Sequence, residues 1–365
     1  MGFITGTYTM KIIHARNVNE AYTIGLNALN AVGNVEDSRV GQVKVFPTPV
    51  ATVYEKPCER VLFNERRDAN PFFHLMESLW MLAGRNDVEW IKNYNSTFDQ
   101  FSDDGTSFNA AYGYRWRYQF KRDQLAELIA MLKRDPNTRR AVVSMWDPYA
   151  DFNADGKDFP CNLNIAFRIR NSKLTMTVFN RSNDIIWGAY GANAVHMSIL
   201  QEYIAGALDL CVGEYTQVSN DYHAYTEVMA RVGVPEPHPM CPYDMGAVEP
   251  YLLGVENQLS WDQTLFYFMV DSQLFHQQNY DPKYHFDMAR FVMVPFFADI
   301  AVPMVRAWGR FKRKDYKAAI SLITETMPDC DWKTNCKEWL IRKAERNATS
   351  NAEKRRIRKA VAHDI

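Results

Sequence analysis

A cysteine that directly follows a proline, at the start of an alternating apolar segment, constrains this chain more than any other feature. Residues 158–167 read DFPCNLNIAF, so this cysteine is Cys161. The apolar positions that follow it alternate with polar or small ones, which is the pattern of a half-buried strand: Leu163, Ile165, Phe167 and Ile169. We therefore expect Cys161 at the leading end of a strand, where side chains line clefts.

A thiol in such a place becomes a nucleophile only if nearby cations lower its pKa toward the thiolate. The candidates are Arg139, Arg140 and Arg181. The alternative is that Cys161 packs as a small hydrophobe, as any of the six cysteines could.

Two later motifs favour the nucleophile. NRSND at 180–184 supplies an Arg-Ser pair, and GAYGANAVH at 188–196 supplies a side-chain amide. A thiol, an Arg-Ser pair and an amide are the groups needed to attack a pyrimidine ring, hold its phosphate and read its edge. The sequence therefore indicates an enzyme that acts on a nucleotide.

Length and composition fit a globular enzyme. The chain has 365 residues, 47% of them hydrophobic, and a formal net charge of -1, which argues against disorder and against general attraction to nucleic acid. Prolines and an aspartate interrupt the apolar stretch 291–305, so we expect no membrane span. The six cysteines show no CxxC spacing, no signal-peptide core is recognisable and the eight histidines are scattered. We therefore expect a cytoplasmic protein without a metal site.

The predicted elements follow a mixed order that is typical of the α+β class. Helices are expected at 71–94 with an interruption at Gly84, at 122–133 and, buried, at about 192–207. Strands are expected at 141–146, 162–169 and 174–179. From about residue 302 the composition shifts to two charged helices, at 306–319 and 332–360. We therefore expect a catalytic domain over residues 1–300 and a helical C-terminal extension over 301–365, whose basic tail at 354–359 is interpreted as a solvated helix end.

Seven blocks of this sequence, in order, resemble motifs of the thymidylate synthase family: ESLWMLAGRNDVEWI, AYGYRWR, DPNTRRAVVSMW, FPCN, NRSNDIIWG, GANAVH and NDYHAY. The resemblance runs from about Arg39 to about Tyr225 and implies the family's mixed sheet packed with helices. The family includes thymidylate synthases and the pyrimidine nucleotide hydroxymethylases found especially in phages.

The resemblance assigns the covalent chemistry to Cys161. Carbon 5 of a uracil ring accepts a one-carbon unit only after a thiolate has added at carbon 6 and converted the ring into an enolate. Glu77 resembles the family's proton-shuttling carboxylate, and Tyr112 the tyrosine beside the thiol. Asn162 stands where the synthases have histidine. We expect Glu77 or Asn162 to orient a water, and favour Glu77 because its carboxylate can also accept the proton.

Substrate recognition is implied for eight further positions. Asn193 resembles the asparagine that reads the pyrimidine, because its amide can donate to O4 and accept from N3–H; the family's cytidylate hydroxymethylases carry an aspartate there. A helix-capping amide is the alternative for Asn193. The other positions are the phosphate ligands Arg181, Ser182 and Arg39, the pair Arg139 and Arg140 that each subunit of an obligate homodimer lends to its partner, and the deoxyribose-binding His223 and Tyr225.

The one-carbon donor implied by the resemblance is 5,10-methylenetetrahydrofolate. Asp184 resembles the aspartate that hydrogen-bonds the pterin of this folate. Phe98 and Trp80 are expected to contact the same molecule.

Two departures from the synthases decide the expected product. Residues 97–101 read TFDQF, so Phe98 and Phe101 replace indoles that shelter the methylene intermediate, and the synthases' closing PHPxIKAPVAV segment is absent. A less sheltered methylene meets water rather than hydride. We therefore expect deoxyuridylate 5-hydroxymethylase activity, without a membrane or nucleic-acid partner, in the host cytoplasm if the chain is viral. The alternatives are a thymidylate synthase, a deoxycytidylate hydroxymethylase and a non-catalytic RNA-binding relative.

Overall fold

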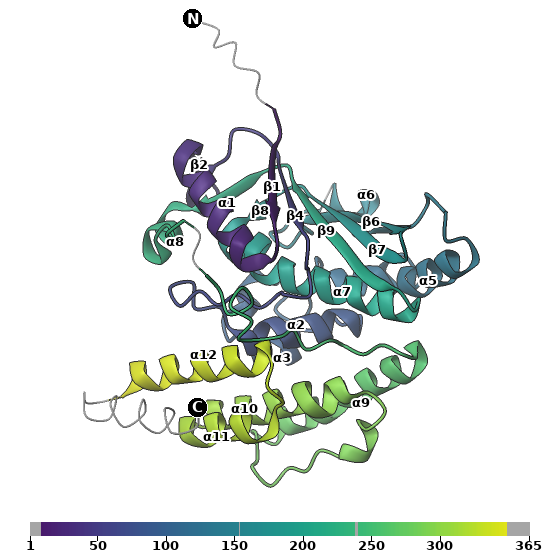
Figure 1. Cartoon of the computed structure of the whole chain (residues 1–365), viewed down its shortest axis with the longest axis vertical. Coiled ribbons are helices and arrows are strands. Elements are labelled where there is room, and N and C mark those ends of the chain that lie inside the picture. Colours follow the sequence, from purple (N-terminus) through teal and green to yellow (C-terminus); the bar gives the residue numbers. More distant parts are fainter. Residues whose placement is uncertain (1–8, 153, 238–239, 349–365) are drawn as a thin grey trace, which may run out of the picture.

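The computed structural model describes residues 9–152, 154–237 and 240–348. Figure 1 shows three layers, in which two helices separate a large sheet from a second group of helices. The helices of the middle layer are α2 (Pro71–Leu82) and α7 (Asn193–Ala207). The mixture of helices and sheets confirms the α+β class.

The large sheet has six strands in the order β1–β4–β9–β7–β6–β5. In that order the strands are Lys11–Ala15, Val50–Tyr54, Cys211–Ser219, Lys173–Asn180, Asn162–Arg170 and Val142–Ser144. The pairs β1–β4 and β7–β9 are parallel, and the other pairs are antiparallel. The register of β6 against β7 is irregular between Asn162 and Asn164, directly after the cysteine. Such irregularities re-aim side chains and are frequent next to active sites.

The two faces of this sheet differ in burial. One row of paired residues across all six strands is buried throughout: Ile13, Thr52, Gln217, Val178, Ile165 and Val143. The neighbouring row is half-buried or exposed throughout: His14, Val53, Thr216, Thr177, Ala166 and Val142. Successive residues of a strand point to opposite faces. One face of the sheet therefore covers the core, and the other is open in the single chain.

A smaller sheet has the order β2–β3–β10–β8. Its strands are, in that order, Asn34–Ser38, Gly41–Val45, Tyr222–Tyr225 and Asn183–Asp184. Strand β8 pairs in parallel with β10, so that Asp184 lies opposite His223. This pairing brings the NRSND and NDYHAY segments together.

Helix α7 is buried along almost its whole length, and α2 packs against it. A wide helical turn, η3 (Ile185–Ala192), leads into α7 through a kink at Gly191. Helix α2 begins at Pro71, because the side chain of Asn70 caps it. It ends before Gly84, whose φ of +71° favours glycine.

The remaining elements of the sheet-containing part are short or peripheral. Helices α1 (Val18–Val32) and α5 (Gln124–Arg134) are capped by Asn17 and Asp123. The short ones are α3 (Val88–Ile91), η1 (Phe98–Phe101), α4 (Tyr112–Tyr114), η2 (Arg115–Gln119), α6 (Pro148–Asp151) and α8 (Thr226–Val232).

The third layer is helical (Figure 1). It contains α9 (Gln258–Gln277), η4 (Met288–Arg290), η5 (Phe297–Ala301), α10 (Val302–Lys312), α11 (Tyr316–Thr326) and α12 (Asp331–Asn347). Phe72 of α2 packs between Trp308 and Trp339, with ring centroids 5.5 and 5.6 Å away. Asp68, just before α2, accepts hydrogen bonds from three cations of α12 at 2.6 to 3.2 Å. This layer therefore buttresses the helix that carries Glu77.

Most of the predicted elements are confirmed. Strands β6 and β7 and helices α5 and α7 match their predictions to within two residues, and α2 and α3 are interrupted around Gly84 as expected. Strand β5 is shorter than the predicted 141–146. No described helix has the length and apolar character needed to cross a membrane.

The C-terminal predictions need one correction. A continuous helix at 306–319 is wrong: α10 ends at Lys312, Lys314 has a φ of +61°, and Asp315 caps the separate helix α11. The helix predicted at 332–360 is confirmed as far as Asn347. Ala348 is no longer helical, and residues 349–360 of the prediction, with the basic tail at 354–359, lie outside the described residues. The boundary at residue 300 stays a prediction, and α9, in the same layer as α10, precedes it.

Candidate active site

Cys161 lies directly before β6 and is half-buried. Arg181, directly after β7, braces the turn that leads to it, donating from Nε to the carbonyl of Pro160 at 2.9 Å and from Nη2 to the carbonyl of Phe159 at 3.2 Å. The same Nη2 lies 3.9 Å from the Sγ atom of Cys161. The thiol therefore sits at the strand start with one guanidinium beside it.

Burial raises the pKa of the Cys161 thiol above its usual value, and the charge of Arg181 opposes that rise. The carboxylates of Asp158 and Asp221 add to it. The lowered thiol pKa expected from three arginines is therefore not found in the single chain. The expected lowering is absent because Arg139 and Arg140 are exposed, and of the three arginines only Arg181 is close to the sulfur. The thiolate form gains from any further cation that enters the site.

A chain of amides crosses the site. Asn162 donates from Nδ2 to Oδ1 of Asn193 at 3.3 Å, and Asn193 donates from Nδ2 to Oδ1 of Asn183 at 3.1 Å. Asn183 in turn donates to Oγ of Ser219 at 3.0 Å. Gly188 leaves room for this network of amides, since a Cβ there would lie 2.9 Å from Oδ1 of Asn183. The network orients the amide of Asn193 and leaves it one N–H and one lone pair for a ligand.

Asn193 lines a cavity of about 220 Å³ that lies beside α2 and α7. Glu77 of α2 and Tyr112 of α4 line it as well. The hydroxyl of Tyr112 accepts a hydrogen bond from the backbone N–H of Asn162 at 3.4 Å. Burial raises the pKa of Tyr112, so its phenol is neutral. Three separate helices therefore bring Glu77, Tyr112 and Asn193 together, next to the residue that follows the thiol.

Aromatic rings form one wall of this cavity. Phe98 contacts Phe101 and Phe108 with ring centroids 5.7 and 5.1 Å away, and Phe108 contacts Trp80 at 6.1 Å. Trp80 is buried, and its Nε1–H lacks an acceptor among the described residues. Phe101 is 51% exposed, so the wall is partly open to solvent. It offers a flat ligand aromatic faces and one unused donor.

Glu77 faces a histidine of α7. The Nε2 atom of His196 lies 3.0 Å from Oε2 of Glu77, and both side chains are at least nine-tenths buried. The two atoms are not aligned as a hydrogen bond, and neither bonds to any other atom in the described part of the chain. His74, one turn before Glu77, is neutral because burial lowers its pKa well below that of an ordinary histidine. A buried acid–base pair therefore opens onto the cavity without a complete set of partners.

Asp184, His223 and Tyr225 gather where β8 and β10 pair. Oδ1 of Asp184 accepts hydrogen bonds from two backbone N–H groups of η3 at 2.8 and 2.6 Å. Its Oδ2 is buried without a partner among the described atoms, and burial raises the pKa of this carboxyl. Burial alone would lower the pKa of His223, but a 2.7 Å contact with the Asp221 carboxylate raises it. The rings of His223 and Tyr225 are 6.0 Å apart.

The remaining predicted residues lie at or near the surface. Ser182 is half-buried beside Arg181. Arg39 is exposed in the turn between β2 and β3, and its charge opposes the rise that burial causes in the pKa of Tyr225. Arg139 and Arg140 are exposed between α5 and β5, and neither guanidinium bonds to another described residue. A single chain thus gathers the thiol, the amide and Glu77, and leaves these three arginines at its surface.

Two titratable residues of the cavity, His196 and Asp158, were not identified as site residues from the sequence. His196 follows Asn193 by three positions, so the two share a helix face, and this spacing could have indicated it. Asp158 accepts a 2.6 Å hydrogen bond from the backbone N–H of Asn109, and burial raises its pKa to about 6. Its position depends on a tertiary contact 49 residues apart, so no local pattern marks it.

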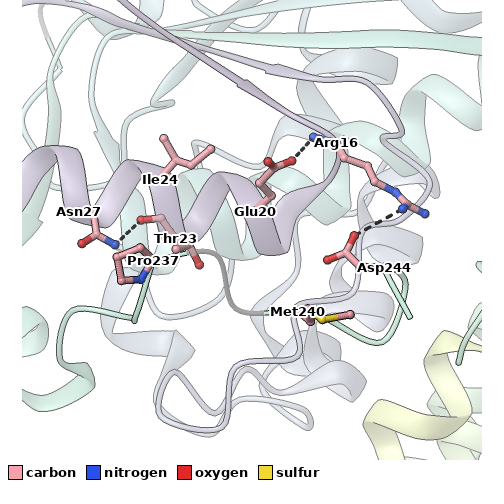
Figure 2. A pocket seen from close by; sticks show the side chains of 8 residues that line it. All are labelled: Arg16, Glu20, Thr23, Ile24, Asn27, Pro237, Met240 and Asp244. Carbon is pink, nitrogen blue, oxygen red and sulfur yellow. Dashed lines mark hydrogen bonds and ion pairs between the residues drawn. The ribbon is translucent and has the colours of Figure 1, made fainter. Parts of the chain in front are cut away.

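A larger cavity, of about 570 Å³, lies along α1 (Figure 2). The charged groups at this cavity are paired with one another. Arg16 forms ion pairs with Asp244 at 3.4 Å and with Glu59 at 2.8 Å, and the backbone N–H of Arg16 donates to Glu20 at 2.6 Å. None of the predicted site residues lines it. Over the described ranges, no group of three His, Cys, Asp or Glu side chains could hold a metal ion.

Comparisons with known proteins identify the family of this chain. Residues 67–238 match a family model described as thymidylate synthase. A Pseudomonas phage M6 protein named deoxyuridylate hydroxymethyltransferase is 44% identical over 351 residues, which is 92% of this chain and 95% of that relative. Proteins of the same name from Bacillus phage SP01 and Delftia phage PhiW-14 are 43% and 30% identical, over 49% and 59% of this chain and 50% and 62% of their own. This chain belongs to the thymidylate synthase family.

Proposed function

We propose that this protein is a deoxyuridylate 5-hydroxymethylase. It transfers a one-carbon unit from 5,10-methylenetetrahydrofolate to carbon 5 of dUMP and adds water, which yields 5-hydroxymethyl-dUMP and tetrahydrofolate. The phage M6 relative that carries the corresponding name aligns over almost its full length. The observation that carries the proposal is the amide of Asn193, held by its neighbours in the cavity with a donor and an acceptor free. Uracil offers the complementary O4 acceptor and N3–H donor.

The first step is the attack of Cys161 on the ring. Its thiolate forms a bond to carbon 6, and the ring electrons move onto O4 as an enolate. The free N–H of Asn193 donates to that oxygen and stabilises the charge. Tyr112, whose hydroxyl touches the backbone after the thiol, is placed to relay a proton at carbon 5.

Phosphate and sugar binding fall to the residues beyond the thiol. Arg181 and Ser182 follow β7 directly, and Arg181 already points its guanidinium toward Cys161. Arg39 approaches the same region from the β2–β3 turn, close enough to act on Tyr225. His223 and Tyr225 of β10 are assigned to the deoxyribose hydroxyl.

The residues assigned to the folate fit such a ligand. A pterin presents N–H donors and a carbonyl acceptor on a flat ring. The buried Oδ2 of Asp184 and the buried Nε1–H of Trp80 are an acceptor and a donor without described partners. Phe98 adds an aromatic face to the same cavity as Trp80. The folate, when bound, supplies the one-carbon unit, and these side chains orient it.

The active form is an obligate homodimer in this proposal. The open face of the six-stranded sheet carries apolar residues that a partner would cover, among them Val142 at 49% and Phe179 at 39% exposure. A second copy of the chain presents the same face, as a two-fold interface requires. Arg139 and Arg140, exposed and unbonded, are then available to the partner's phosphate site and would favour its thiolate.

Water, rather than hydride, completes the reaction. The phenyl rings of Phe98 and Phe101 cover the cavity less than indoles would, and Phe101 is half-exposed. Glu77 accepts the proton of the water as it adds to the methylene carbon. Because the relatives come from phages and the reaction consumes a nucleotide and a reduced folate, we place the enzyme in the cytoplasm of a bacterial host.

The test is product analysis with dUMP and methylenetetrahydrofolate in oxygen-18 water. We expect 5-hydroxymethyl-dUMP with solvent oxygen on the new carbon, together with tetrahydrofolate. The second candidate, favoured by the match of residues 67–238 to the thymidylate synthase model, is synthase activity. It predicts thymidylate and dihydrofolate, and finding these as main products would overturn the hydroxymethylase.

A further inference from the structure

We propose that His196 is the positioning residue for the hydration step: it holds the carboxylate of Glu77 in the orientation in which Glu77 receives a proton from the water. This inference rests on the proposed hydroxymethylase function and adds a residue that the resemblance did not assign. It concerns the last chemical step alone, and leaves the attack of Cys161 and the reading of the base by Asn193 unchanged.

The geometry that carries the proposal is the meeting of α2 and α7. His196 follows Asn193 by three positions, so both side chains reach the same cavity from one face of α7. Glu77 reaches it from α2, and Nε2 of His196 is 3.0 Å from Oε2 of Glu77. A histidine N–H at that distance can fix one carboxylate oxygen and leave the other oxygen facing the cavity.

The burial of the pair explains why a fixed orientation matters. Oε2 of Glu77 and Nε2 of His196 are buried and, within the described chain, unbonded. Buried polar atoms are normally satisfied, and exceptions are concentrated at functional sites. Catalytic hydrogen bonds are often misaligned in the free enzyme and tighten when the substrate binds. Other titratable groups near the pair are His74 and Tyr112, which are neutral, and Asp158, which lines the same cavity; the charge of Arg67 acts on the pKa of His74.

The step balances without any further reactant. The oxygen of the water forms a bond to the exocyclic methylene carbon, and the electrons of the carbon–carbon double bond move into the ring enolate. One proton of the water passes to the free oxygen of Glu77. The enolate then expels the thiolate of Cys161 from carbon 6, which restores the aromatic ring and the free enzyme.

Other groups near the cavity are less suited to this role. The side chain of Asn162 has a free Oδ1, but an amide does not accept a proton at neutral pH. Asp158 is held by the backbone N–H of Asn109 at 2.6 Å, which ties one of its oxygens to the scaffold. Glu77 is a proton acceptor that has a histidine, His196, 3.0 Å away to orient it.

The experiment measures how the methylene intermediate is partitioned. With dUMP, methylenetetrahydrofolate and added 2-mercaptoethanol, water and thiol compete for the same carbon, and mass spectrometry gives the ratio of thioether to hydroxymethyl product. This ratio does not depend on the amount of folded enzyme. In His196→Leu, which removes the N–H, we expect the ratio to rise by about 10-fold or more. His196→Gln keeps a donor and should restore much of the wild-type ratio.

The control is Ser198→Ala, a change on the same helix whose hydroxyl bonds only to helix carbonyls and does not line the cavity. It should leave the ratio unchanged. A His196→Leu ratio equal to wild type, or equal changes in His196→Leu and His196→Gln, overturns the role of His196 while wild-type enzyme still forms the hydroxymethyl product. Wild-type formation of thymidylate and dihydrofolate instead overturns the proposed function itself, so the two failures are distinct.

Discussion

Two buried acid–base pairs of this molecule differ in how completely they are bonded. Arg115 and Asp151 are fully buried, joined by two hydrogen bonds of 2.6 and 2.8 Å, and the guanidinium also donates to the carbonyls of Asn109 and Met145. Glu77 and His196 are buried to a similar degree, but their facing atoms have no aligned hydrogen bond. In the first pair every guanidinium nitrogen donates at least one hydrogen bond, whereas the second pair has capacity left for a ligand.

The difference separates residues that hold the fold from residues that act. A buried charge without partners is costly, so it persists only where the surrounding structure enforces it. The Arg115 pair ties η2 to α6 and to the end of β5. At the candidate site, one buried side-chain atom each of Glu77, Trp80 and Asp184 instead remains unbonded within the described residues. Substitutions in the first region should lower stability, and those in the second should lower activity.

The largest effect is expected at Cys161, the proposed nucleophile. Cys161→Ser should retain dUMP binding and the stability of the fold, and lose turnover by on the order of 10³-fold or more, because serine is a far weaker nucleophile at this position. Release of tritium from carbon 5 of labelled dUMP measures the loss. Cys58→Ser is the matched control, since Cys58 is also half-buried and burial raises its pKa to about 11. Comparable tritium release by Cys161→Ser would assign the nucleophile elsewhere.

The opposite outcome is expected in the scaffold. Arg115→Met leaves the carboxylate of Asp151 buried and unpaired, so unfolding in urea should show a loss of about 3 to 5 kcal/mol. Arg122→Met, which breaks an exposed pair with Glu127, should leave the stability close to that of the wild type. An Arg115→Met variant as stable as the wild type would contradict the division between the two regions.

The stability lost in Arg115→Met should depend on pH, because Arg115 pairs with the titratable carboxyl of Asp151. Burial alone would raise the pKa of Asp151, but the hydrogen bonds of Arg115 lower it below the ordinary 3.8. A lowered carboxyl pKa contributes stability that is present above the unfolded-state pKa and is lost as the pH falls through the folded-state value. Without Arg115, burial raises the pKa of Asp151, so the variant takes up this proton at a higher pH than the wild type. The difference in unfolding free energy between wild type and Arg115→Met should therefore be largest at neutral pH and shrink as the pH falls from the variant's raised pKa toward the lowered pKa of the wild type.

Local patterns predicted more of the scaffold than of the site's electrostatics. The alternation after Cys161 and the apolar helix at 192–207 predicted β6 and α7, because burial on one face imposes a period that a sequence displays. The break between α10 and α11 was missed, since a left-handed Lys314 has no strong sequence signal. The family motifs singled out Glu77, Tyr112 and Asn193, which line one cavity in the structure. The raised pKa of Cys161 could not be predicted in this way, because it depends on burial in three dimensions.

Asp158 joins the two regions, and its effect is intermediate. Its Oδ2 accepts from the N–H of Asn109, whose carbonyl accepts from Arg115. Burial raises its pKa to about 6, so its contribution to stability is full below about pH 4 and is lost as the pH rises through 6. Asp158→Asn should change the pH dependence of the unfolding free energy by about 2 to 3 kcal/mol between pH 4 and 7. Asp209→Asn, at an exposed position, is the control, and equal pH profiles for both variants would contradict the assignment.

The smallest effect, on base choice, tests the cavity most closely. Asn193→Asp replaces an N–H that donates to Oδ1 of Asn183 with an oxygen, so two acceptors face each other at about 3.1 Å unless the Asn183 amide turns over. Its turning is feasible, because the hydroxyl of Ser219 can donate where it now accepts. The variant should therefore fold, use dUMP less well by about 1 to 3 kcal/mol in kcat/KM, and use dCMP better. Competition between the two nucleotides measures the shift. Asn180→Asp, at a buried asparagine that does not line the cavity, should leave the preference for dUMP intact. If the Asn193 and Asn180 variants keep the same preference, the base is read by another group.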